Sequence, residues 1–174
     1  MKTKDLVLMA MFVALYAVLE YLKVAFNFFS MPQGGSVSLA AVPLLLAGYF
    51  LGFRKGLLVT VVSVLVGFMI EPPYILHYAQ VFLDYFLGYA AYSLAVLIPN
   101  IKVSKISLPV GTVVSDFVRF MASNLSGWIF FRSAYEGNVI WGVMGYNATY
   151  MIPVMIVNFV FVFILLPRLK PLIK

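Results

Sequence analysis

Six long apolar stretches alternate with short polar or proline-containing segments along this chain. We place these stretches at about residues 6–25, 39–53, 56–70, 80–98, 106–131 and 140–166. A bilayer core is about 30 Å thick and takes about 20 helical residues to cross, and only helices or closed barrels satisfy their backbone hydrogen bonds there. The pattern therefore predicts an all-α integral membrane protein with six transmembrane helices. The second and third stretches are short, at about 15 residues each, and tilt or local thinning of the bilayer would accommodate them.

The composition agrees with a single membrane domain that covers residues 1–174. Hydrophobic residues make up 64% of the chain and charged residues 10%, and the mean hydropathy is +1.04. A water-soluble domain of this composition would lack a polar surface. Little chain is left outside the six stretches, so we expect no soluble catalytic or nucleotide-binding domain.

The basic residues lie mostly at the ends of the apolar stretches. Counted by alternate sides of the membrane, one side carries Lys2, Lys4, Arg54, Lys55, Lys102, Lys105, Arg168, Lys170 and Lys174. The other side carries Lys23 and Arg132. Because cytoplasmic loops are enriched in Lys and Arg, this asymmetry predicts that both termini lie in the cytoplasm. The net charge of +6 is spread along the chain without a basic patch or a recognition motif, which argues against nucleic acid as a partner.

Asp84, Asp116 and Arg119 differ from the other charged residues because they lie inside apolar stretches. A charged group at the centre of a bilayer costs about 2.5–3.5 kcal/mol on insertion scales, so such residues usually face a polar cavity and mark a ligand or ion site. Asp84 is followed by Tyr85 and preceded by Gln80 one helical turn earlier. A carboxylate beside aromatic rings suits a small organic cation, since ring faces add cation–π attraction. The alternative is that Asp84 pairs with Arg119, or with a backbone group, only to hold the helices together.

The fifth and sixth stretches carry further polar candidates. Arg119 and Ser123 share one helical stripe and could belong to a site or to the scaffold, whereas Ser126 favours close helix packing. Asn147 follows Tyr146 in the sixth stretch. A buried amide donates and accepts hydrogen bonds at once, which suits the edge of a heteroaromatic ring such as an aminopyrimidine.

Other candidates each have a structural alternative. Trp141 could stack on a ligand or belong to the aromatic belt at the membrane interface. His77 could sense protons, or it could cap a helix or pack within its loop. Ala10 and Ala14 form a pair of small residues four apart, which permits close contact within the bundle or with a separate membrane subunit.

Signatures of metal sites and of enzymes are missing from the sequence. The chain has no Cys and a single His, so it offers no ligand set at metal-binding spacing. Motifs of metalloproteases, serine hydrolases and P-loop proteins are absent as well. We therefore expect no metal, no cofactor and no enzymatic activity.

A series of short motifs occurs in the same order as in a known family. The motifs are Ala10-x-x-x-Ala14, Pro32-Gln33-Gly34-Gly35-Ser36-Val37-Ser38-Leu39, His77-x-x-Gln80-x-x-Leu83-Asp84-Tyr85, Arg119-Phe120, Ser126-Gly127 and Tyr146-Asn147-x-x-Tyr150. Over nearly its whole length the chain resembles the thiamine-specific substrate-binding subunit, or S-component, of energy-coupling factor (ECF) transporters. The resemblance implies a six-helix, multi-pass subunit of the prokaryotic plasma membrane that captures a vitamin from outside with high affinity. It also implies a transmembrane coupling protein and two cytoplasmic ATPases as partners.

The resemblance further implies roles for individual residues. Ala10 and Ala14 correspond to the face of the first helix that contacts the coupling protein in the family. Asp84, with Tyr85 beside it, corresponds to the acidic ligand residue of the family, which is usually Glu. Asn147 corresponds to the family's ligand-binding asparagine in the sixth helix.

Four positions in or beside the fifth and sixth helices refine this comparison. Arg119 matches a basic residue of the family, but Ser123 stands where the family has His, and Phe131 where Trp is frequent. Gly142 stands where the family has Tyr. Because these changes remove an imidazole and a phenol, the resemblance implies thiamine or a thiamine-like or precursor compound, and it leaves the exact ligand open.

We expect the ligand pocket near the outer leaflet, formed by the fourth, fifth and sixth spans and closed by the loop of residues 27–38. The residues expected to bind the ligand are His77, Gln80, Asp84, Tyr85, Arg119, Ser123, Phe131, Trp141, Tyr146 and Asn147. Arg119 would orient Asp84 or Asp116. The alternative is a stand-alone proton-coupled transporter in which Asp84, Asp116 and Arg119 form a relay. A further alternative is an intramembrane enzyme or an assembly chaperone. The enzyme is the weakest hypothesis, because the sequence lacks a catalytic dyad.

Overall fold

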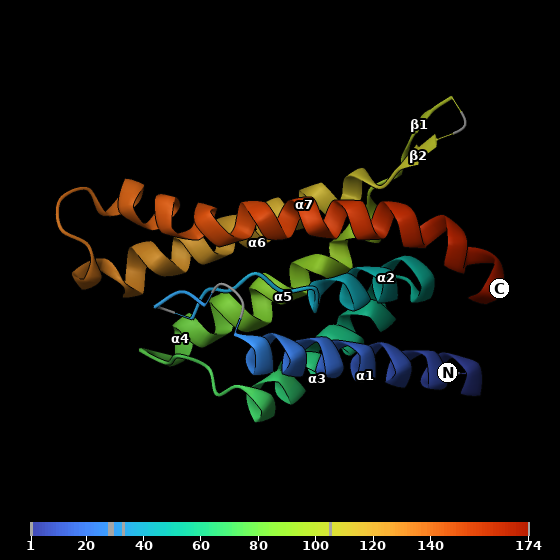
Figure 1. Cartoon of the computed structure of the whole chain (residues 1–174), viewed down its shortest axis with the longest axis horizontal. Coiled ribbons are helices and arrows are strands. Elements are labelled where there is room, and N and C mark those ends of the chain that lie inside the picture. Colours follow the sequence, from blue (N-terminus) through green and yellow to red (C-terminus); the bar gives the residue numbers. More distant parts are fainter. Residues whose placement is uncertain (1, 28–29, 33, 105, 174) are drawn as a thin grey trace.

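The structure is mainly helical (Figure 1); it is a computed structural model that describes residues 2–27, 30–32, 34–104 and 106–173. The long helices are α1 (Thr3–Phe26), α2 (Ala41–Leu51), α3 (Phe53–Ile70), α6 (Val110–Phe130) and α7 (Val139–Ile173). The segment between α3 and α6 contains α4 (Tyr78–Val81), the π-helical turn η1 (Phe82–Leu87), α5 (Gly88–Ala90) and the 3₁₀ turn η2 (Ala91–Leu97). A short 3₁₀ turn, η3 (Arg132–Ala134), follows α6. Gln33, Lys105 and Lys174, which entered the sequence predictions, lie outside the described residues.

The helices run roughly along one long axis of the molecule (Figure 1). α6 packs against α7, η1 and η2, while α1 packs against α2 and α3. Both ends of the chain lie at the same end of the bundle (Figure 1).

Several of the helices are suited to a membrane. In the described part of the chain, four helical segments are long and apolar enough to cross a bilayer: Thr3–Phe26, Phe53–Ile70, Tyr78–Leu97 and Val139–Leu172. α2 is apolar but has only 11 residues. α6 has 21 residues and buries polar side chains along one face, among them Thr112, Asp116 and Asn124. The chain is therefore a helical membrane protein, while the number of six crossings and the cytoplasmic position of the termini stay predictions.

The expected start of the fifth helix at residue 106 is wrong. Residues Ile106–Leu108 form strand β2, which pairs antiparallel with β1 (Ile101–Val103), and α6 begins only at Val110. The local sequence alternates apolar residues with Lys or Ser, which is the period of a strand. Pro109 also disfavours a helical conformation in the residue before it, so the apolar content misled the prediction.

The expected end of the sixth helix at Pro167 is also wrong, because α7 continues through Pro153, Pro167 and Pro171 to Ile173. Proline removes one hydrogen bond from a helix but keeps a helical φ angle. Helices in membranes tolerate proline because neighbouring groups satisfy the freed backbone carbonyl. The long helix therefore passes these positions without ending.

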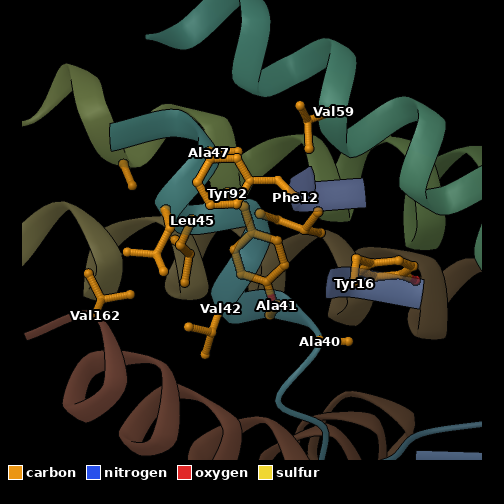
Figure 2. Close-up of a cluster of buried hydrophobic side chains, with 13 residues drawn as sticks. Phe12, Tyr16, Ala40, Ala41, Val42, Leu45, Ala47, Val59, Tyr92 and Val162 are labelled. Carbon is orange, nitrogen blue, oxygen red and sulfur yellow. The ribbon is translucent and has the colours of Figure 1, made fainter. Parts of the chain in front are cut away.

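The hydrophobic core surrounds α2, which is short and apolar on all sides. Residues Ala41–Gly48 of α2 are all buried, and Figure 2 shows Phe12 of α1, Val59 of α3, Tyr92 of η2 and Val162 of α7 around them. A helix that is hydrophobic all round is typical of a buried position. α2 is thus the central element on which α1, α3, η2 and α7 pack.

We predict that Gly127→Ala destabilises the protein by about 1–3 kcal/mol, the usual cost of overpacking a core. A Cβ atom at Gly127 of α6 would lie 2.3 Å from Cγ1 of the buried Val143 of α7, and a β-branched side chain has little freedom to move away. The measurement is the thermal unfolding midpoint in detergent. Gly145→Ala in α7 is the matched control, because nothing lies within 4 Å of a Cβ atom there. Equal midpoints for the two variants would contradict the close contact of α6 with α7.

Candidate ligand cavity

A cavity of about 420 Å³ lies between the helices, within the range of about 300–1,000 Å³ that is typical of small-molecule sites. Its walls come from α1, α3, the Tyr78–Leu97 segment, α6 and α7, with part of the loop of residues 27–38. Gly35 of this loop lies so close to Tyr150 of α7 that a Cβ atom would be 2.6 Å from the ring. The described part of the loop thus lines the cavity, and the absence of a side chain at Gly35 lets the loop approach α7.

Asp84 lies in the cavity wall on the π-helical turn η1. Its Oδ2 atom accepts a hydrogen bond of 2.8 Å from Nε2 of Gln80 and one of 2.9 Å from Oγ of Ser126. Both donors are neutral, and no ion pair joins Asp84 to a cation within the described residues. π-helical turns are frequent at functional sites. The carboxylate is therefore held in place on the cavity wall by neutral donors and not by an ion pair.

Arg119 does not form the expected ion pair with Asp84 or Asp116. Its Nη1 atom donates a hydrogen bond to the hydroxyl of Tyr92, and its guanidinium carbon lies 4.3 Å from the ring centroid of Tyr89. The ring of Tyr92 is 5.3 Å away. Aromatic faces stabilise a desolvated cation by roughly 2 kcal/mol. The buried charge of Arg119 thus rests on two tyrosines of the Tyr78–Leu97 segment.

Asp116 belongs to a different environment, between α6 and α7 and away from the described cavity lining. Its Oδ1 atom accepts a hydrogen bond of 2.8 Å from Nδ2 of Asn158. Asp116 is 4% exposed and Asn158 is 0% exposed. This pair joins two helices and does not face the ligand space.

A chain of hydrogen bonds fixes Asn147 in the wall. Tyr150 donates to Oδ1 of Asn147 at 3.1 Å, Nδ2 of Asn147 donates to Oδ1 of Asn124 at 3.1 Å, and Nδ2 of Asn124 donates to the carbonyl of Phe120 at 2.8 Å. An amide can make up to four hydrogen bonds. Asn147 therefore keeps one donor and one acceptor position that these contacts do not use, in a fixed orientation.

The structure brings most of the expected ligand residues together. Gln80, Asp84, Tyr85, Arg119, Ser123, Phe131, Tyr146 and Asn147 all line the cavity. His77 and Trp141 do not belong to the described lining. The Nδ1 atom of His77 accepts a hydrogen bond from the backbone N–H of Ala79 at the start of α4, and Trp141 is 70% exposed. Their positions fit the capping and interface alternatives.

Sequence reasoning missed a whole wall of the cavity, which α1 provides. Tyr16, Glu20 and Lys23 line the cavity from this helix, and Glu71 lies beside them at the end of α3. The spacing of four and three residues places the α1 side chains on one helical face. Two charged residues, Glu20 and Lys23, lie near the end of the first apolar stretch, and they were the feature of the sequence that could have indicated this wall. By its place in the sequence alone, Lys23 is a charge at the boundary of the first apolar stretch.

Ser126 was also assigned only to helix packing. Its hydroxyl in fact donates to Asp84 from α6, although 42 residues separate the two. No local pattern in the sequence reveals a contact of this kind, because it depends on how η1 packs against α6.

Apolar helices around a cavity with polar and charged side chains in its wall are typical of a membrane protein that binds a small polar molecule. Residues 6–174 match the family described as thiamine transporter protein (Thia_YuaJ), and the chain belongs to this family. It is 34% identical over 142 residues to the thiamine transporter ThiT of Bacillus subtilis (strain 168), a match that covers 75% of this chain and 74% of the relative. These findings confirm the family resemblance and identify a transporter and not an enzyme.

The fold is also that of a solved structure. ThiT from Listeria monocytogenes matches this chain with a TM-score of 0.75 at 15% sequence identity, over 97% of this chain and 96% of that chain. At this identity the likeness shows the fold alone.

We predict that Tyr92→Phe destabilises the protein by about 1.5–3 kcal/mol, the usual contribution of a hydrogen bond to a charged group. The variant keeps the ring but removes the hydroxyl that accepts from Arg119. The measurement is the unfolding midpoint in detergent, with Tyr21→Phe as the control because Tyr21 is 63% exposed. An unchanged midpoint for Tyr92→Phe would show that this buried hydrogen bond contributes nothing.

Proposed function

We propose that this chain binds thiamine, or a thiamine-like or precursor compound, from outside the cell and is the substrate-binding subunit of an ECF-type importer. The observation that carries the proposal is the position of Asp84 in the cavity wall, where two neutral donors hold it and no ion pair joins it to a cation within the described residues. Thiamine has a permanently charged thiazolium ring and an aminopyrimidine ring. The positively charged thiazolium ring would be the ion-pair partner of Asp84.

The other wall residues suit the rest of such a ligand. Tyr85 and Phe131 offer ring faces for cation–π contact and stacking, while Asn147 and Ser123 offer hydrogen-bonding groups for the edge of the pyrimidine ring. The ring of Phe131 is itself stacked on Tyr74, with centroids 6.0 Å apart. An aromatic surface is thus in place where the family frequently has Trp.

Tyr135 compensates for the glycine at position 142 in this proposal. A Cβ atom at Gly142 would lie 2.6 Å from Cδ1 of Tyr135, and Tyr135 lines the cavity. A tyrosine ring thus occupies the space beside α7 that a side chain at position 142 would take. We propose that Tyr135 replaces the tyrosine that the family has at this position.

The side of α1 that faces away from the cavity supports a proposal about partner subunits. Ala10 and Ala14 are exposed and line a shallow apolar groove between α1 and α3, together with Leu58 and Val62. Small residues let a second helix approach closely. We propose that the transmembrane coupling protein packs here, that two ATPases provide the energy, and that the complex lies in the prokaryotic plasma membrane with both termini in the cytoplasm.

The contacts do not favour a proton relay. Arg119 bonds to Tyr92, Asp116 to Asn158, and Asp84 to Gln80 and Ser126, and no ion pair connects the three charged residues in the described structure. A relay requires groups that exchange protons through direct contacts or ordered water. The stand-alone transporter is therefore the weaker proposal.

We predict that Asp84→Asn weakens thiamine binding by about 2–5 kcal/mol, because the variant removes one partner of a desolvated charge pair. Binding of the neutral aminopyrimidine precursor of thiamine should change little. The measurement is isothermal titration calorimetry of the purified protein with both compounds.

Asp116→Asn is the matched control, since Asp116 is also a carboxylate that accepts a hydrogen bond from a neutral side-chain amide, but it does not line the cavity. It should retain the affinity of the parent protein for thiamine. Equal losses for the cationic and the neutral compound in Asp84→Asn would identify Asp84 as a structural residue. No thiamine binding by the parent protein would refute the proposed function itself.

We predict that Ala14→Trp abolishes co-purification with the coupling protein and ATP-dependent uptake, but leaves thiamine binding by the isolated subunit intact. The bulky ring would fill the groove that the partner needs. Leu15→Trp is the control, because Leu15 is 46% exposed and lies on another face of α1. Normal uptake by Ala14→Trp would exclude this face as the coupling surface.

A further inference from the structure

A second charged cluster lies in the cavity wall, away from Asp84 in the sequence. Nζ of Lys23 lies 2.5 Å from Oε1 of Glu20 and 2.5 Å from Oε2 of Glu71. Glu20 and Lys23 belong to α1, whereas Glu71 caps the end of α3. Lys23 therefore connects two helices across the wall of the cavity.

The cluster runs from solvent into the cavity wall. The side chain of Glu71 is 49% exposed, that of Lys23 is 12% exposed and that of Glu20 is 8% exposed. Pro72, Pro73 and Tyr74, which follow Glu71, line the cavity as well. The Lys23–Glu71 contact thus lies at the rim, where the cavity meets solvent.

α1 and α3 are joined by ion pairs near both of their ends. At the other end of the helices, Nζ of Lys55 lies 2.8 Å from Oδ2 of Asp5. Asp5 and Lys55 do not line the cavity in the described structure. The two ion pairs hold the same two helices together, but only one of them borders the ligand space.

We propose that Glu20, Lys23 and Glu71 form the gate of the cavity, and that the Lys23–Glu71 contact must open for the ligand to enter and leave. Glu20 keeps Lys23 in position from the buried side, and Glu71 is the partner that separates. The identity of the ligand rests on the proposed function, whereas the gate does not. Opening of α1 from α3 exposes the same wall to any small molecule.

Glu71→Gln is the variant that tests the gate. It breaks the contact between the helices but leaves the buried Lys23–Glu20 pair intact, so that no buried charge loses its partner. Asp5→Asn is the matched control, because it breaks the other ion pair between α1 and α3. An effect on overall stability would appear in both variants, and an effect on the gate in Glu71→Gln alone.

The first readout needs no ligand. The chain contains no Cys, so Ser123→Cys places a single thiol in the cavity wall, and its rate of modification by a small charged thiosulfonate reports opening. Glu71→Gln should raise this rate roughly two- to fivefold, as expected for the loss of a partly exposed ion pair, whereas Asp5→Asn should leave it unchanged. Tyr78→Cys, at a position that is 88% exposed, should react equally fast in every background. Equal rates at residue 123 in the parent and Glu71→Gln, or equal acceleration by Asp5→Asn, would overturn the gate.

The second readout is the dissociation rate of thiamine. Glu71→Gln should raise the dissociation rate constant by about the same factor, and 1 M salt should remove the difference from the parent because it screens the half-exposed pair. Faster cysteine modification with an unchanged dissociation rate would overturn the proposed role in ligand release. A parent protein that binds no thiamine would refute the proposed function, while the cysteine readout would still decide the gate.

Discussion

The organisation of the cavity depends on one electrostatic constraint, the presence of Asp84 in an apolar segment, where no ion pair joins its carboxylate to a cation within the described residues. Two neutral donors, Gln80 and Ser126, hold the carboxylate at 2.8 and 2.9 Å. Hydrogen bonds of this kind reduce the cost of burying a charge but do not neutralise it. Electrostatic attraction is much stronger in such an environment than in water. A positively charged group placed at this position would therefore be attracted to the carboxylate more strongly than in water.

Other polar groups in this region contact partners that join one helix to the next. Arg119 rests on Tyr89 and Tyr92, and Asn147 and Asn124 join α7 to α6. These contacts connect the Tyr78–Leu97 segment, α6 and α7, which together carry most of the polar wall. Polar residues thus both join the helices and line the cavity. The contacts of each side chain show which of these positions it occupies.

The sequence was sufficient for the features that depend on local pattern. The contrast between Asp84 and its apolar surroundings indicated a site, and the helical spacing correctly placed Gln80 beside it. The sequence pattern could not predict contacts between residues that are far apart in the chain. Ser126 meets Asp84 from another helix, and Arg119 prefers two tyrosines to either carboxylate. Apolar content also concealed the β1–β2 hairpin before α6, because hydropathy alone does not separate a strand from a helix end.

The most direct test is an experimental structure of the protein with thiamine bound. The account predicts that the thiazolium ring lies within about 6 Å of an aromatic ring face and next to the carboxylate of Asp84, inside the cavity between α1, η1, α6 and α7. Thiamine at another position, or a carboxylate of Asp84 turned toward the helix packing and away from the ligand, would contradict it.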